Sequence, residues 1–140
     1  MNKSQRGVTL MELMVVVVIL AILASIAVPS YRRYVMRSNR TEATAALLQV
    51  RIAQEKFFLQ NGQYADDGAL STAPPAGLGI PGTTASSYYT IALDRTSTTA
   101  YVATATAVNG QADDDSCATL TINESGTRDS APSEISECWR

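Results

Sequence analysis

The sequence predicts an α+β fold in which one long helix covers a small antiparallel sheet. Apolar residues recur at helical spacing up to about residue 60, and alternating strand patterns occupy residues 88–122. The 140 residues are enough for one such domain and a membrane anchor. A pair of cysteines near the C-terminus predicts that the last segment is fastened covalently.

Residues 8–28 form an apolar run long enough, as a helix rising about 1.5 Å per residue, to cross one bilayer core. In a secretory signal peptide the apolar region precedes the cleavage site, whereas here the small residue Gly7 precedes the run. Cleavage after Gly7 would remove a leader, residues 1–7, and keep the anchor. The formal charge would fall from −2 to −4, because the leader holds Lys3 and Arg6 and no acidic residue.

Glu12 is the only charged residue in the apolar run. A carboxylate in hydrocarbon costs roughly 2.5–3.5 kcal/mol on insertion scales, so leucine would serve a simple anchor better. One interpretation is that Glu12 is matched to a positive partner. The other is that Glu12 is neutralised or reaches the head groups, because it lies only four residues from Val8.

Pro29 ends the apolar segment, residues 8–29, and is expected to bend the helix because it lacks an amide donor. Residues 30–60 are predicted to continue as an amphipathic helix, with an apolar stripe at three- and four-residue steps. Asn61 and Gly62 are typical of a helix end. The stripe contains Ala43, Ala46, Leu47, Val50, Ala53 and Phe57.

Residues 61–87 are rich in Gly, Pro, Ser, Thr and Ala, which predicts a long and variable loop. Residues 88–140 are predicted to form the antiparallel sheet and a polar tail. The expected strands are Tyr88–Leu93, Ala100–Val108 and Cys117–Ile122. The acidic run 113–115 is interpreted as a solvated turn in preference to a calcium site, because it lacks EF-hand spacing.

Cys117 and Cys138 are the only cysteines, and an even pair in a small extracytoplasmic domain is most simply one disulfide. This places the C-terminal domain outside the cytoplasm. The basic residues do not decide the orientation, because Lys3 and Arg6 precede the apolar run and four arginines follow it. Those arginines either contact lipid head groups and neighbouring subunits or form a solvated face; they are Arg32, Arg33, Arg37 and Arg40.

The composition excludes several classes of function. The absence of histidine excludes histidine-based catalytic triads and histidine metal sites. The acidic balance gives no general attraction for nucleic acid, which disfavours a DNA partner without excluding one. No phosphate loop or Gly-x-Ser-x-Gly motif is present, so no catalytic role, cofactor or metal is expected.

The chain resembles the type IV pilins, and specifically PilE-like pilins. Gly7 is followed by an apolar helix with Glu12 at its fifth position, and Gly-Val-Thr-Leu-Met-Glu-Leu is close to the family's Gly-Phe-Thr-Leu-Ile-Glu-Leu. The segments 37–43 and 117–126 and the two cysteines also fit. Val8 stands where the family usually has phenylalanine.

The resemblance implies a type IV pilin fold with a C-terminal disulfide loop, cleaved after Gly7 by a prepilin peptidase and N-methylated at Val8. It further implies that Glu12 pairs with the α-amine of Val8 in a neighbouring subunit. The subunit would wait in the inner membrane with its C-terminus in the periplasm, and the assembly machinery would then add it to a helical surface filament of itself and other pilins. The alternatives are a type II secretion pseudopilin and, more distantly, a membrane-anchored enzyme or DNA receptor.

Overall fold

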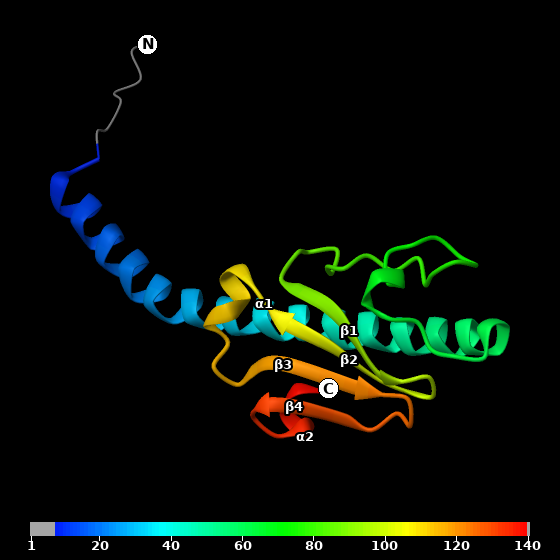
Figure 1. The fold of residues 1–140 in the computed structure, drawn as a ribbon. Coiled ribbons are helices and arrows are strands. Elements are labelled where there is room, and N and C mark those ends of the chain that lie inside the picture. The colour runs from blue at the N-terminus through cyan, green and yellow to red at the C-terminus, as the bar shows by residue number, and fades with distance from the viewer. Residues whose placement is uncertain (1–7, 140) are drawn as a thin grey trace, which may run out of the picture. The chain divides into compact units, whose positions relative to one another are not determined.

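The structure, a computed structural model, describes residues 8–139 and divides them into two compact units that meet between Val35 and Met36. One long helix is followed by four strands and three short helical turns (Figure 1). In chain order the elements are α1 (Leu10–Asn61), η1 (Asp67–Ala69), β1 (Tyr89–Ser97), β2 (Ala100–Ala107), η2 (Asn109–Asp113), β3 (Cys117–Asn123), β4 (Arg128–Pro132) and α2 (Ile135–Cys138). The predicted α+β class is confirmed.

The first unit is a bare apolar helix. Every large apolar side chain from Val8 to Val28 is at least 50% exposed, and none has a protein core to pack against. An 18-residue window of α1 has a mean hydropathy of 2.8, so this helix is long and apolar enough to cross a membrane. The helix includes Pro29 and continues beyond it, because one missing amide donor interrupts a single hydrogen bond between long helical segments. The predicted bend stays a prediction.

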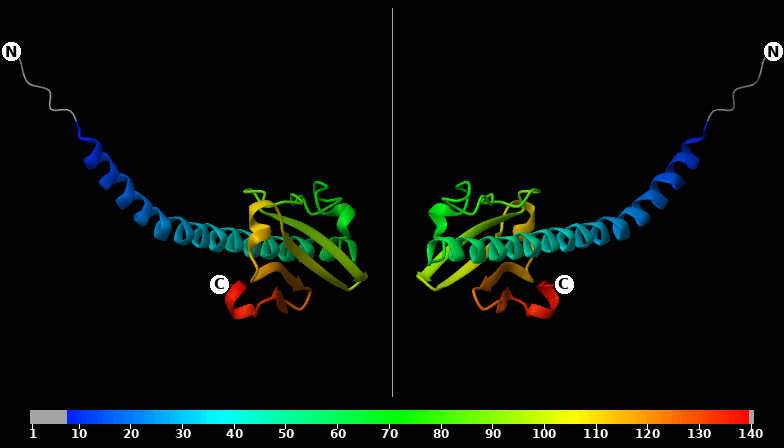
Figure 2. Two further views of the ribbon diagram at one scale, coloured as in Figure 1. Left: turned by 90° about the vertical axis from the view of Figure 1, so that its left-hand side faces the viewer. Right: turned by 90° about the vertical axis from the view of Figure 1, so that its right-hand side faces the viewer.

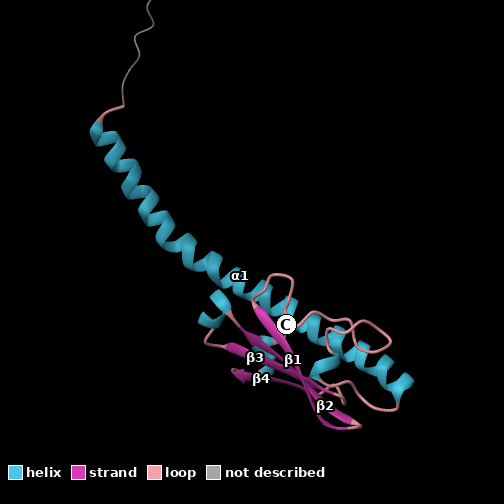
Figure 3. Cartoon of the chain, turned by 45° about the horizontal axis from the view of Figure 1, so that its top comes forward, coloured by secondary structure: helices cyan, strands magenta, loops and turns pink. Residues whose placement is uncertain are grey.

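In the second unit the C-terminal part of α1 packs against a sheet whose strand order is β1-β2-β3-β4, all neighbours being antiparallel (Figure 3). The predicted apolar stripe of α1 is confirmed in its centre, where Ala43, Leu47 and Val50 are fully buried. The other residues of the stripe, Ala46, Ala53 and Phe57, are partly buried against the same core. Strands β1 and β2 contribute alternate residues, as period-2 patterns require, whereas a register shift between Cys117 and Thr119 interrupts the alternation in β3. The buried strand residues are Tyr89, Ile91, Leu93, Tyr101, Ala103, Ala105, Cys117, Leu120 and Ile122.

Helix α1 ends where the sequence predicts. Gly62 adopts φ +68°, which favours glycine, and its amide donates to the Phe58 carbonyl at 2.8 Å. The loop that follows, residues 62–88, contains only the short turn η1 and one isolated bridge, Thr83 with Thr90. Gln54, which is fully buried on α1, fastens the start of this loop by exchanging two hydrogen bonds with the backbone of Ala65, at 2.8 and 3.0 Å.

Strand β4 was not predicted from the sequence. It pairs with β3 from Cys117 to Ile122, so the tail after residue 127 is part of the sheet (Figures 1 and 2). Four of its five residues are exposed, so neither face of the strand requires apolar side chains and the sequence shows no apolar alternation. Trp139 covers the strand: its Nε1 donates to the Asp129 carbonyl at 2.9 Å, and its ring lies 5.1 Å from the Arg128 guanidinium carbon.

Candidate functional site

Glu12 lies in the first turn of α1. Its backbone amide donates to Thr9 Oγ1 at 3.2 Å, whereas its carboxylate has no hydrogen bond or ion pair within residues 8–139. A carboxylate near a helix N-terminus gains about 0.3–1 kcal/mol from the helix dipole, which is less than the roughly 2.5–3.5 kcal/mol cost of placing it in hydrocarbon. Contacts within the subunit therefore do not offset the cost of a charged Glu12 side chain in the apolar segment. Val8 precedes the helix and is 72% exposed, and Gly7 lies outside the described residues.

The four arginines that follow the apolar run do not share one environment. Arg32 and Arg33 belong to the first unit and are exposed. Arg37 is also exposed, but Arg40 is partly buried and forms an ion pair within its own subunit. Sequence reasoning missed this separation, because helical spacing places Arg33, Arg37 and Arg40 on one face and does not show what that face meets.

Arg40 pairs with Asp114, the middle residue of the acidic run. Arg40 Nε donates to Asp114 Oδ2 and Arg40 Nη2 donates to Oδ1, both at 2.6 Å. Asp114 is buried, while Asp113 and Asp115 are exposed. The interpretation of the whole run as a solvated turn is therefore wrong for Asp114, whose side chain turns inward to meet the helix. Within residues 8–139 no group of three or more His, Cys, Asp or Glu side chains is placed to hold a metal ion.

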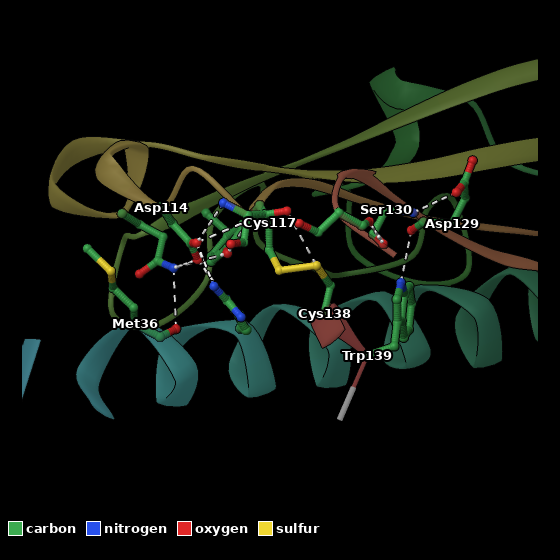
Figure 4. The surroundings of a disulfide bond; sticks show 12 residues. Met36, Asp114, Cys117, Asp129, Ser130, Cys138 and Trp139 are labelled. Atoms are coloured by element: carbon green, nitrogen blue, oxygen red, sulfur yellow. Dashed lines mark hydrogen bonds and ion pairs between the residues drawn. A yellow bond between two sulfur atoms is a disulfide. The ribbon is translucent and has the colours of Figure 1, made fainter. Parts of the chain in front are cut away.

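Gln111 extends the Arg40–Asp114 pair into a buried polar network (Figure 4). Its Nε2 donates to Asp114 Oδ2 at 2.8 Å, and its Oε1 accepts from Asn39 Nδ2 at 2.9 Å. Burial alone raises the pKa of Asp114, but the hydrogen bonds and charge of Arg40 outweigh burial and hold that pKa below its usual value. The network joins α1 to η2 and to the start of β3.

Cys117 and Cys138 form the predicted disulfide, with a Cα–Cα distance of 5.7 Å (Figure 4). Both cysteines are buried. Asp114 Oδ1 accepts the Cys117 amide at 3.4 Å, and the Tyr89 hydroxyl donates to the Cys117 carbonyl at 3.2 Å. Burial raises the pKa of Tyr89, so this hydroxyl keeps its proton and remains a donor. The disulfide and the polar network are thus directly connected, because Asp114 and Tyr89 both hydrogen-bond to the backbone of Cys117.

Several hollows mark the surface of the second unit, and the three described below border α1. Two of them, of about 320 and 450 Å³, lie between α1 and the loop that follows it, and they share Gln49 and Ile80. The first exposes apolar residues of α1, including Ile52, which is 58% exposed. The third, of about 440 Å³, lies between α1 and α2 and is lined mainly by charged side chains.

Known proteins resemble the chain over most of its length. Residues 2–28 match the prokaryotic N-terminal methylation motif, and residues 29–121 match the family described as "Type IV minor pilin ComP, DNA uptake sequence receptor". Among curated proteins, the type IV major pilin protein PilA of Myxococcus xanthus is 43% identical over 46% of this chain and 30% of its own length. The type IV major fimbrial protein FimA of Dichelobacter nodosus is 39% identical over 62% of this chain and 54% of its own length.

These curated relatives are matched over 30% to 54% of their own length. A solved structure of a type IV pilin from Shewanella oneidensis superimposes with a TM-score of 0.53 and covers 75% of this chain and 98% of its own. Its sequence identity is 24%, so this similarity bears on the fold alone. The fold is thus shared with a solved structure over three quarters of this chain.

Proposed function

The chain belongs to the type IV pilin family, and from this premise we propose that it is a structural subunit that polymerises into a type IV pilus. Pilins are structural proteins, and no side-chain arrangement described above requires a catalytic role. The observation that carries the proposal is the bare helix of the first unit. An apolar helix of this length is stable in two environments, a bilayer and a bundle of similar helices. A pilin subunit occupies the first before assembly and the second in the filament.

In the first state the unassembled subunit is anchored by residues 8–29 in the inner membrane, with the disulfide-bonded unit in the periplasm. A prepilin peptidase cleaves between Gly7 and Val8 and methylates the new amine, which keeps its charge. The match of residues 2–28 to a methylation motif supports this step. The disulfide supports an oxidising compartment for the second unit.

In the second state the helices of many copies and of other pilins form the filament core. Apolar packing supplies the cohesion, and the exposed apolar face of α1, which includes Leu48 and Ile52, is covered by neighbours. Glu12 pairs with the α-amine of Val8 in a neighbouring subunit and fixes the register. Two opposite charges desolvated together cost less than either alone, which supports this assignment for an otherwise unpaired carboxylate.

Mass spectrometry of filaments sheared from cells tests the proposal. We expect the chain to be present in quantity, to begin at a methylated Val8, and to carry an intact Cys117–Cys138 bridge. Absence of the chain from sheared filaments, with retention in the membrane fraction of a piliated cell, would contradict a role as a pilus subunit.

The matched family suggests DNA uptake as a second function. That family is described as a DNA uptake sequence receptor, whereas the charge of this chain without its leader is −4, which weakens any general attraction for phosphates. Binding of the purified subunit to duplex DNA, measured at two salt concentrations, separates the two functions: sequence-dependent binding that persists at 150 mM salt would establish the receptor role. A type II secretion pseudopilin is not favoured, because the matched family and relatives are pilins.

A further inference from the structure

The polar hollow between α1 and α2 has a composition that helix-on-sheet packing does not explain. Its volume of about 440 Å³ falls in the range of small-molecule sites. Two of its residues come from α1 and four from the segment that ends at the disulfide. They are Arg37, Arg40, Glu134, Ser136, Glu137 and Cys138.

The charges around this hollow are not balanced within the subunit. Arg40 forms an ion pair with Asp114, and the negative charge of Glu137 also acts on Arg40 from a greater distance. Within residues 8–139 the guanidinium of Arg37 and the carboxylates of Glu134 and Glu137 have neither a hydrogen bond nor an ion pair. One positive group and two negative groups therefore line the same hollow without pairing to each other. A ligand that carries both signs of charge would satisfy them together.

We propose that this hollow binds a phosphoethanolamine group, with the phosphate on Arg37 and the ammonium on Glu134 and Glu137. A guanidinium offers parallel N–H donors that match two phosphate oxygens, and an ammonium offers three donors for carboxylates. A simple anion is disfavoured by the two glutamates, and a simple cation is disfavoured by Arg37.

Two sources can supply this group: the head group of a phospholipid, or a soluble ester. The lipid source rests on the proposed membrane anchoring of the subunit. Arg37 follows Val28, the end of the apolar run, by nine residues, and a helix of that length advances about 14 Å. This length of chain therefore allows Arg37 to reach the head groups of a bilayer that holds the apolar run. The chemistry of the site is the same for both sources.

The test uses the processed full chain, labelled with nitrogen-15, in maltoside micelles that contain no phosphate. Glycerophosphoethanolamine should shift the amide resonances of Arg37 and of residues 134–138, and glycerophosphoglycerol should bind at least about tenfold more weakly, because it lacks the ammonium. Arg37→Gln should weaken binding of glycerophosphoethanolamine about tenfold. The double substitution Glu134→Gln with Glu137→Gln should weaken it as much and also abolish the preference over glycerophosphoglycerol.

Matched controls remove the same charges outside the hollow. Arg33→Gln and Asp94→Asn should leave the affinity unchanged, because neither residue lines the site. The same resonances recorded in nanodiscs with and without phosphatidylethanolamine identify the source: shifts that require the lipid assign the head group, and shifts seen only with the free ester assign a soluble ligand. Absence of shifts in both media, or equal binding of the two esters by the wild type, overturns the proposal. Filament assembly plays no part in these measurements, so their failure would leave the pilus assignment standing.

Discussion

Arg40 and Asp114 form a two-pronged ion pair that joins α1 to the turn before β3, with both N–O distances at 2.6 Å. The two side chains are 16% and 3% exposed, so the pair is largely removed from water. Asp114 also accepts the amides of Ser116 and Cys117, which begin the disulfide-bounded loop. A single carboxylate therefore connects the helix to the most constrained part of the sheet.

Asp114→Asn should destabilise the second unit by about 3 kcal/mol, because it leaves Arg40 largely buried without its counter-charge. The free energy of unfolding can be measured in urea on the processed chain in micelles, with Trp139, the single tryptophan, as the fluorescent probe. Asp115→Asn is the matched control, since Asp115 is exposed, and it should change stability by less than about 0.5 kcal/mol. Equal losses in the two variants would show that the pair contributes nothing specific.

Acid should weaken the fold through the same carboxylate. The pKa of Asp114 is lower in the folded chain than its ordinary value, so the unfolded chain binds the proton more readily. The stabilisation is therefore complete above about pH 4, the usual range for an unfolded aspartate, and is lost as the pH falls through the lower folded pKa. Unfolding free energies between pH 5 and pH 2 should fall more steeply for the wild type than for Asp114→Asn. Parallel curves would contradict this assignment.

Sequence periodicity predicted the helix and the strands that have one buried face and one exposed face. The stripe through Ala43, Leu47 and Val50 and the alternation in β1 and β2 both arise because one face is buried and the other is not. Strand β4 has no such contrast, and it is held in place by its pairing with β3, by the nearby bridge and by Trp139. A local pattern cannot show a strand that is exposed on both faces.

The buried polar contacts could not be predicted from the sequence, for a different reason. Three adjacent aspartates look alike in the sequence, and contacts made in the folded chain distinguish Asp114 from its neighbours, above all the ion pair with Arg40, 74 residues away. The buried Gln54 is similar, because a glutamine on a helix is usually solvated until a loop supplies backbone partners. The cysteine pair needed no such information, since two cysteines allow a single pairing.

Cys138→Ser should destabilise the second unit by about 2–5 kcal/mol, as expected for loss of a bridge that closes a loop of this length. Because β4 is held to β3 by backbone pairing, the loosening should be greatest after Pro132, in α2 and at Trp139. Amide hydrogen exchange of the variant locates it. Faster exchange spread evenly over β1 and β2 would show that the bridge supports the whole sheet instead of its C-terminal edge.

Processing should leave Val8 as the first residue, because the small residue and the charged leader precede the apolar run. A bulky residue at position 7 should block cleavage, so Gly7→Leu should accumulate as an uncleaved chain in the membrane. N-terminal sequencing of both proteins checks this, with Thr9→Ser as a control that should be cleaved normally. An intact Met1 in assembled wild-type filaments would end the proposed processing step.

Glu12 provides the sharpest test, because anchoring and assembly predict opposite results for the same substitution. Glu12→Leu removes a charge from an apolar helix, so membrane insertion should be unchanged or improved. If Glu12 is only tolerated, filaments should form as well as before. If Glu12 pairs with the α-amine of Val8 in a neighbour, the variant leaves that amine unpaired among packed helices.

An unpaired buried charge costs roughly 3–5 kcal/mol, and in a filament this cost recurs at every subunit. Glu12→Leu should therefore accumulate as stable, processed monomer in the membrane while sheared filaments fall sharply. Glu12→Gln, which keeps the shape without the charge, should resemble Glu12→Leu, whereas Glu12→Asp should lie between, because it keeps the charge and shortens the reach. Met11→Leu, an apolar exchange at the adjacent position, should assemble normally. Shear assays and membrane fractionation compare the four variants, and a wild-type filament yield from Glu12→Leu would reject the intersubunit pair.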